Sequence, residues 1–521
     1  MFTKLARPLT SMLCAMALML SAGDALAAPG NGDACGKLSG DEKIDCEEKS
    51  VLRAAWANYL SAVDHTTEVM MESPVYENDP TGLYDLQSGM IITNMMLFGA
   101  SGSGIRANRP RWGFFDTPDT RLGVDNPDTR YLSALIPNEG GQNVFKVYGN
   151  RSNSCDMIVL TLDPTDPQGG GETIEDEDMF NTSGGPLAHG ENYEVYLSSA
   201  EMRDPNWLNW LEIASNNTAA VHHRHTVCNY HTERPGQPHV ERVGTEGVPV
   251  TGEEFRDAYG IAAGMDLATD TMMDQQLFWA GFSQFIQNSG LPANVAGPWL
   301  ATGGLGITSQ LNSLSWLTIP DGYAYVLRVR RDYPGAYGSW MLFNGWGSSL
   351  QWGSNMVNGS FVIEGSDLPT GPNSYFTPSA IVEDINPQLC PDRPGVDPET
   401  CEGTAQYTTV IISNDEIVFE HPAVGRLVPH NWMTTMGHNP VYLAGRLQGV
   451  PNNEDPTDPN NPFNYVQGVG GWMPYGFLVP VAAIAPGSPA LPADTVWITE
   501  DQRTAQIRER QIFQQEKYKP W

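Results

Sequence analysis

The feature that most restricts the fold is a strict alternation of side chains in the second half of the chain. In residues 323–330 apolar or aromatic side chains occupy every second position, and Arg328 and Arg330 stand between them. Successive side chains of a strand point to opposite faces, so this segment predicts a β-strand. Residues 407–412 are all β-branched or aromatic and predict another strand. Further short runs of this kind, bounded by Gly, Asn, Asp and Pro, predict antiparallel, sandwich-like sheets.

Helical patterns occur in separate blocks. Apolar residues follow three-four spacing between residues 52 and 63, and again in an apolar stripe from Leu277 to Ile286. Helices in runs and strands in runs predict an α+β fold with an N-terminal helical region and a helical insert between two strand regions. We therefore expect a signal peptide (1–27), an N-terminal helical region (28–110), a first β-rich region (111–250), a helical insert (251–321), a second β-rich region (322–485) and a C-terminal tail with a helix (486–521).

The N-terminus predicts export. Lys4 and Arg7 precede an apolar run at residues 12–20, and Ala25-Leu26-Ala27 offers a small-residue cleavage site. This is the pattern of a cleavable signal peptide, which indicates a periplasmic or secreted protein. We see no later apolar run long enough for a membrane-spanning segment.

The cysteines agree with an oxidising compartment. Six remain after cleavage, and an even number in an exported chain favours disulfides. Closeness in sequence favours two local pairs and leaves the remaining two cysteines for each other. The expected disulfides are Cys35–Cys46, Cys155–Cys228 and Cys390–Cys401.

The charge restricts the partners. A net charge of −32 excludes nucleic acid as a partner, because phosphate binding needs a basic surface. Acidic loops at residues 163–166, 172–178 and 452–458 could bind calcium, although none has the spacing of an EF-hand. Calcium or a transition metal is therefore an alternative and not a requirement, and the oligomeric state is left open.

Five of the ten histidines lie between residues 222 and 239. On a strand His223 and His225 would share one face, and His231 and Glu233 follow shortly after. Three interpretations stay open. The stretch could form a transition-metal site with His223, His225 and His231, an acid–base site in which Glu233 orients a histidine, or a polar strand beside a disulfide.

A second candidate site follows the strand at residues 407–412. Histidines, a tryptophan and an arginine occur together in the residues that follow this strand. Further tryptophan, tyrosine and arginine side chains come from residues 323–352, which precede it. His438 could act as a base, and Arg446, which we expect on a loop rich in glycine and proline, could stabilise a developing anion. Tryptophan and tyrosine faces suit sugars, aromatic compounds or steroid-like rings, and Trp207 and Trp210 belong to the same class. The expected ligand-binding residues are Trp432, Asn431, Trp340, Trp346, Arg328 and Tyr325.

Several segments together resemble a known bacterial family. They are NPDTRY at 126–131, VHHRHTVCNYHTE at 221–233, AYVLRVRRDYPGAYGSWMLFNGWGSSLQW at 324–352, NGSF at 358–361, YTTVIIS at 407–413 and NWMTTMGHNPVYLAGR at 431–446. This set resembles the domain-of-unknown-function family DUF-1214, best over 323–448 and more weakly over 122–245. The chain departs from the family pattern at Met433 and Thr434, where Leu and Asp are expected. The resemblance implies sandwich-like sheets with a helical insert and no established reaction.

Three functions are compatible with these patterns. The first is an exported protein with a pocket for a ring-bearing small molecule. The second is a hydrolase or lyase that uses a histidine base and an arginine at the same pocket. The third is a structural envelope protein whose aromatic residues form the core. A convergent cavity with a hydrogen bond between a histidine and a carboxylate would favour the enzyme, and a cavity without such a bond would favour binding.

Overall fold

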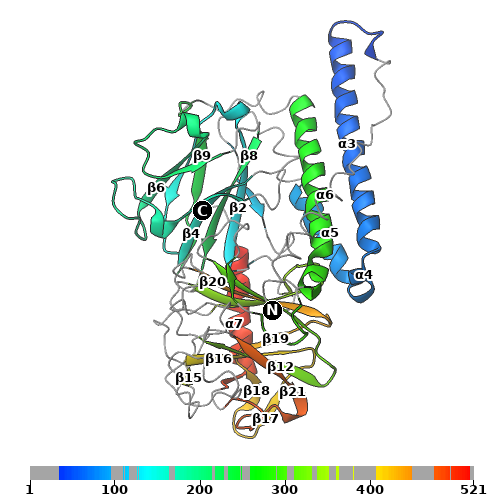
Figure 1. Ribbon diagram of the computed structural model, residues 1–521, viewed down its shortest axis with the longest axis vertical. Helices are drawn as coiled ribbons and strands as arrows, with labels where there is room; N and C mark the ends of the chain where they lie inside the picture. Colours follow the sequence, from blue (N-terminus) through cyan, green and yellow to red (C-terminus); the bar gives the residue numbers. More distant parts are fainter. Residues whose placement is uncertain are drawn as a thin grey trace.

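Helices and several sheets make up the described part of this α+β protein, as expected (Figure 1). The predicted signal peptide lies outside the described residues. No helix in the described part is long and apolar enough to cross a membrane. The computed structural model describes residues 35–94, 110, 112–115, 126, 128–162, 170–213, 218–227, 233–246, 248, 258–288, 290–297, 299–301, 310–330, 337–350, 360–362, 379–380, 406–448, 474–492 and 495–516.

Four helices form the helical part. They are α3 (Asp41–Met71), α4 (Pro74–Asn78), α5 (Pro80–Asn94) and α6 (Ala258–Asn288). The long helices α3 and α6 lie side by side, and their facing side chains form one apolar cluster (Figure 1). The buried residues of α3 recur every three or four positions, which confirms the predicted helical spacing; they are Ala55, Tyr59, Ala62, Thr66 and Met70.

The first strand region is a sandwich of two sheets. One sheet has the order β1 (Gly113–Phe115), β2 (Thr129–Pro137), β8 (Thr218–Thr226), β4 (Asp156–Leu162), β5 (Gly170–Glu175). The other has the order β7 (Trp210–Glu212), β6 (Asn192–Ser198), β3 (Phe145–Asn150), β9 (Pro238–Arg242). All neighbours are antiparallel except β6 and β7. Side chains from both sheets, including Phe145, Val147, Val159 and Val195, form the core between them.

The second strand region has three sheets. The first has the order β10 (Leu300–Ala301), β11 (Leu311–Leu317), β20 (Val441–Gln448), β13 (Tyr337–Phe343), β14 (Ser360–Val362). The second has the order β15 (Ser379–Ala380), β16 (Gln406–Ser413), β12 (Tyr323–Arg330), β21 (Tyr475–Pro480), and β19 (Trp432–Thr434) pairs with β16. The third has the order β17 (Phe419–His421), β18 (Gly425–Pro429), β22 (Trp497–Thr499). Within the interval 251–321, helix α6 is thus followed by β10 and β11. The C-terminal helix α7 (Glu500–Glu516) packs near β18 and β22.

Short 3-10 turns interrupt the loops at η3 (Glu139–Gly141), η4 (Asp176–Asp178), η5 (Ala200–Met202) and η9 (Val481–Ala483).

The predicted alternation along β12 is confirmed. Tyr325, Leu327 and Val329 belong to one buried cluster, whereas Ala324 and Val326 belong to another on the opposite face. Both faces of the strand are therefore covered. This burial gives the large apolar area that stabilises the second region, at roughly 25 cal/mol per Å².

Candidate functional site

The histidine-rich strand is β8. It runs between β2 and β4, so alternate side chains point into the first sandwich. His223 and His225 share this inner face, as predicted, and both are completely buried. Their ring centres lie 4.7 Å apart.

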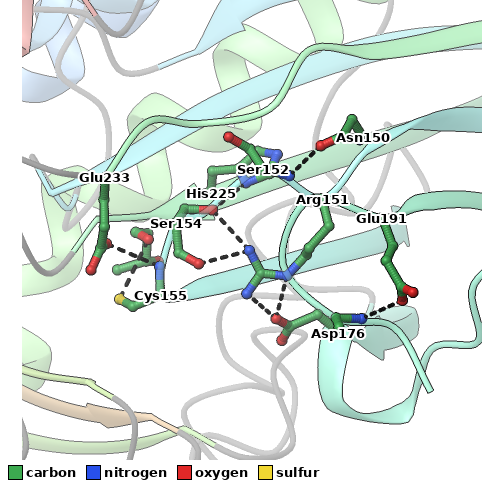
Figure 2. A network of polar contacts seen from close by, with 11 residues as sticks. Asn150, Arg151, Ser152, Ser154, Cys155, Asp176, Glu191, His225 and Glu233 are labelled. Carbon is green, nitrogen blue, oxygen red and sulfur yellow. Dashed lines mark hydrogen bonds and ion pairs between the residues drawn. The ribbon is translucent and has the colours of Figure 1, made fainter.

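Each of these rings has a hydroxyl partner. Ser154 Oγ lies 2.7 Å from His225 Nδ1, and Tyr193 Oη lies 2.6 Å from His223 Nε2. Arg151 directly follows β3 and approaches Ser154. One of its guanidinium nitrogens donates to the carbonyl oxygen of Ser154 at 2.7 Å and to Ser154 Oγ at 3.1 Å. Ser154 Oγ thus lies between the guanidinium of Arg151 and the ring of His225 and links the two (Figure 2).

Arg151 also binds a carboxylate. Its Nε lies 2.6 Å from Asp176 Oδ2, and a second nitrogen of the guanidinium contacts the same carboxylate (Figure 2). Arg151 is 1% exposed, so this is a buried charge with its partner supplied by η4. We call Arg151, Ser154, Asp176 and His225 the Arg151 network.

The histidines of β8 are neutral at physiological pH. Burial, helped by Arg224, lowers the pKa of His222 to about 3. Burial also lowers the pKa of His223 and of His225 well below the ordinary value, and the charges of Arg130 and Arg151 add to this effect. The rings of His223 and His225 are completely buried and have no access to a substrate. The Arg151 network therefore holds one end of the sandwich together.

The other members of the histidine stretch are placed as follows. Glu233 accepts a hydrogen bond from the backbone N–H of Cys155 at 3.0 Å (Figure 2). His231 lies outside the described residues. In the described part, no group of three or more His, Cys, Asp and Glu side chains is arranged to hold a metal ion. Cys155 is disulfide-bonded, and its expected partner Cys228 lies outside the described residues, as do Cys390 and Cys401. The disulfide Cys35–Cys46 is present.

The expected aromatic platforms are part of the core. Trp340 is fully buried and packs edge-on against Trp299, with ring centres 5.4 Å apart. Trp346 is also fully buried, in a different cluster with Met70 and Leu83. Tyr325 lies in the same cluster as Trp340. None of these three rings is exposed to a ligand in this conformation.

The remaining expected ligand residues lie around the second sheet of this region. Asn431 Nδ2 donates to the carbonyl oxygen of Thr409 at 3.2 Å, and Arg328 donates to the hydroxyl of Thr409. Trp432 donates its indole N–H to Ser413 Oγ at 2.8 Å. Its ring also lies under the guanidinium of Arg503, at 4.6 Å. Trp432, Trp340 and Trp346 thus belong to three separate clusters.

Arg446 lies inside a strand, although the sequence suggested a loop. It occupies β20, opposite Asn312 on one neighbouring strand and Ser339 on the other. Alternate side chains of a strand point to the same face, so Arg446 lies on the face of β20 that carries Tyr442 and Ala444. These two residues pack against α6. Arg446 is 8% exposed, and its position is that of a buried strand residue.

His438, expected as a base, has a carboxylate partner. Its Nδ1 lies 3.2 Å from Asp79 Oδ2, and the imidazole is 18% exposed whereas the carboxylate is 7% exposed. Asp79 follows α4, and His438 lies in the turn between β19 and β20. The hydrogen bond therefore joins the helical region to the second strand region.

Asp79 is held rigidly. It directly precedes α5, and its Oδ1 accepts the N–H of Gly82 in the first turn of that helix at 2.8 Å. Its Oδ2 accepts the N–H of Gly345 at 3.3 Å. A side chain at position 82 would collide with Asp79 and with Asn344, so a glycine is needed for this close approach.

The electrostatics favour an ionised Asp79. Burial alone would raise the pKa of this carboxyl, but the hydrogen bonds from His438, Gly82 and Gly345 outweigh it and lower the pKa. Tyr442 lies in the same electrostatic environment: burial raises the pKa of its hydroxyl, and the charge of Asp79 adds to the rise. Gln287 donates to this hydroxyl at 2.7 Å.

Sequence reasoning missed Asp79 and Arg151. The run Asn78-Asp79-Pro80 is a typical helix start, with an N-cap residue before a proline, and could have identified Asp79 as a cap. Its pairing with His438 has no local signal. Arg151 stands in a polar segment between two strands, where an exposed loop is the default expectation.

Comparisons with known proteins add a fold and no activity. No protein-family model matches the chain, and no curated protein is found to be similar. An uncharacterized protein from Burkholderia cenocepacia has a similar crystal structure, with a TM-score of 0.57 and 17% identity over 84% of this chain and 100% of that chain. The VPA0106 protein from Vibrio parahaemolyticus gives a TM-score of 0.35 with 11% identity over 75% of this chain and 100% of that chain. The first likeness shows a shared fold.

Proposed function

We propose that the chain is an exported protein that binds a small ring-bearing molecule beside the Asp79–His438 pair. The observation that carries the proposal is the geometry of that pair. Nδ1 of a partly exposed imidazole lies 3.2 Å from a buried carboxylate, which fixes the ring and leaves Nε2 directed away from Asp79. A ring held in this way is a preorganised hydrogen-bonding group for a ligand.

A carboxylate on Nδ1 also favours a second candidate, acid–base catalysis at the same place. Asp79 fixes the imidazole and orients Nε2 away from the carboxylate, which is the placement that a general base of a hydrolase or lyase requires. Catalysis is thus an extension of binding at this site.

Export and family membership belong to the same proposal. The charged N-terminus with its apolar run supports a cleavable signal peptide, and the Cys35–Cys46 disulfide is typical of an oxidising compartment. The segments at 126–131, 221–233, 324–352 and 431–438 support membership of the DUF-1214 family.

The test is a thermal-shift screen of the mature chain, residues 28–521, against monosaccharides, aromatic acids and steroids. Two variants are compared with the wild type. His438→Ala removes the proposed recognition group. His421→Ala is the matched control, because His421 is a partly buried histidine on β17 whose Nδ1 accepts only a local backbone hydrogen bond, from Ala423.

The proposal predicts that at least one compound class raises the melting temperature of the wild type and of His421→Ala but not of His438→Ala. Failure of every class to stabilise the wild type, or equal stabilisation of His438→Ala, would contradict it. Stabilising compounds are then incubated with the protein and analysed by mass spectrometry. Turnover that falls by about hundredfold in Asp79→Asn supports acid–base catalysis, whereas an unchanged compound supports binding alone.

A further inference from the structure

The solvent-facing side of the second sheet in the first sandwich, β7-β6-β3-β9, has an unusual composition. The inward positions of these strands, such as Val147, Val195 and Val240, are apolar and buried in the core. The outward positions of the same strands alternate between aromatic and charged side chains and include no aliphatic residue. The larger outward residues are Lys146, Tyr148, Glu194, Tyr196, Trp210, Glu212, His239 and Glu241, and of these only Glu241 is buried.

The strand register arranges these side chains in two rows across the sheet. In one row Trp210 lies opposite Tyr196, which lies opposite Lys146. In the other row Tyr148 lies between Glu194 and His239. The rings of Tyr148 and His239 stack with centres 5.3 Å apart. Aromatic faces and charged groups are therefore interleaved along the width of the sheet.

A loop adds a further tryptophan to this surface. Trp207 stacks on Tyr196 with ring centres 4.6 Å apart and an interplanar angle of 1°. Both rings remain only partly buried. We call Tyr148, Tyr196, Trp207, Trp210 and His239 the aromatic face.

The loop that presents Trp207 is rigid. The backbone N–H of Asn206 donates to the side chain of Asp204 at 2.9 Å. The backbone N–H of Trp207 donates to the carbonyl oxygen of Asp204 at 3.1 Å. Asn209 is 2% exposed, and its amide bonds Phe180 and the carbonyl of Glu194. The run NWLNW thus uses its asparagines to fix a loop and its tryptophans to present flat rings.

Charged groups are held among the rings. The Arg203 guanidinium lies 4.4 Å from the ring centre of Trp210. Lys146 lies 3.2 Å from Glu194 and 3.7 Å from Glu241, and 5.0 Å from the ring centre of Tyr148. The salt bridges fix the polar groups in place between the rings, where they can donate to or accept from a neighbouring molecule.

Cross-strand pairs on a sheet surface stabilise the sheet by themselves, by about 0.2–1 kcal/mol each. That role accounts for Tyr148 and His239, which face each other on adjacent strands. It does not account for Trp207, which comes from a loop and pairs with no strand. A rigid loop that lays a tryptophan flat on a surface tyrosine points to recognition of a flat molecule.

We propose that the aromatic face binds a neutral oligosaccharide, at a site separate from the Asp79–His438 pair. The C–H face of a sugar ring stacks on aromatic rings, and its hydroxyls reach the carboxylates and the ammonium group between them. The absence of aliphatic side chains at the outward strand positions disfavours a lipid surface. The accessible carboxylates of Glu194 and Glu212, in a chain of net charge −32, disfavour nucleic acid and acidic glycans.

The test uses the mature chain and two neutral probes, cellohexaose and the hexamer of N-acetylglucosamine, in isothermal titration at millimolar concentrations. Trp207→Ala removes the loop ring and leaves every strand intact. Trp56→Ala is the control, because Trp56 is an exposed tryptophan on α3 outside this sheet. Melting temperatures confirm that each variant is folded.

Binding of at least one hexamer is expected, about tenfold weaker in Trp207→Ala and within about twofold of the wild type in Trp56→Ala. Lack of binding by both hexamers would overturn the proposal. So would equal binding by Trp207→Ala and the wild type, or binding to phosphatidylcholine vesicles in place of the sugars. These outcomes are independent of the screen with His438 variants, so each site can fail alone.

Discussion

Replacing Arg151 by methionine should destabilise the protein far more than replacing a surface arginine. Arg151 is 1% exposed and contacts Asp176 through two guanidinium nitrogens and Ser154 through a third. Methionine fills a similar volume but leaves the carboxylate without its cation and the Ser154 carbonyl without its donor. Removing one partner of a buried pair costs about 3–5 kcal/mol. Because the Asp176 side chain is 17% exposed, water can solvate it in part, and we expect about 3 kcal/mol.

The matched control is Arg426→Met. Arg426 has three carboxylates within 4 Å, those of Glu416, Glu420 and Glu500, but its side chain is 43% exposed. Exposed pairs contribute about 0.2–1 kcal/mol, so this variant should lose no more than about 1 kcal/mol despite its larger number of partners. The comparison therefore separates burial from the number of ion pairs.

The assay is urea unfolding at neutral pH, followed by far-ultraviolet circular dichroism and by tryptophan fluorescence. The two signals also show whether the transition is shared by the whole chain. The double variant Arg151→Met/Asp176→Asn should lose less stability than the sum of the single variants, by at least about 1 kcal/mol. A loss in Arg151→Met no larger than in Arg426→Met would refute the reasoning about the Arg151 network.

Three other perturbations have defined outcomes. Asp79→Asn should lower the free energy of unfolding by about 1–2 kcal/mol at pH 7. Because the pKa of Asp79 is lowered in the folded state, this difference from the wild type should shrink as the pH falls below about 4. A difference that does not change with pH would contradict this expectation. Burial lowers the pKa of His225 and keeps its ring unprotonated in the folded state, so the free energy of unfolding should fall as the pH drops below about 6.5. In denaturant titrations, His225→Gln should reduce the dependence of this free energy on pH by about 1.4 kcal/mol per pH unit. Peptide mapping without reductant should find the cross-links Cys35–Cys46, Cys155–Cys228 and Cys390–Cys401, and a free thiol at any of these positions would exclude the corresponding pair.

The elements with periodic patterns were predictable from the sequence. The alternation in residues 323–330 and the three-four spacing in residues 52–63 each depend on one element burying one face, and they identify β12 and α3. The shared face of His223 and His225 follows from the same rule. The complete burial of these two histidines could not be predicted, because it depends on the second sheet that packs over them. The local sequence pattern of the strand carries no information about that sheet.

The site residues were harder to predict because their partners are distant in sequence. His438 was expected as a base, but its carboxylate partner Asp79 comes from a helix cap 359 residues earlier. Trp340 and Trp346 were expected as ligand platforms, yet a large aromatic ring in a strand-rich segment also fills a core, and the composition of the segment is the same in both cases. Glycine and proline near Arg446 suggested a loop, whereas the strand partners Asn312 and Ser339 hold it within a sheet.

The central claim is that Asp79 fixes His438 so that Nε2 can meet a ligand. The most direct measurement is the long-range proton–nitrogen NMR spectrum of the neutral His438 imidazole, assigned by comparison with His438→Ala. Donation from Nδ1 to Asp79 predicts that the proton resides on Nδ1 and that Nε2 carries the lone pair. In Asp79→Asn this preference should weaken. A wild-type ring protonated on Nε2, or a tautomer mixture unchanged by Asp79→Asn, would contradict the claim.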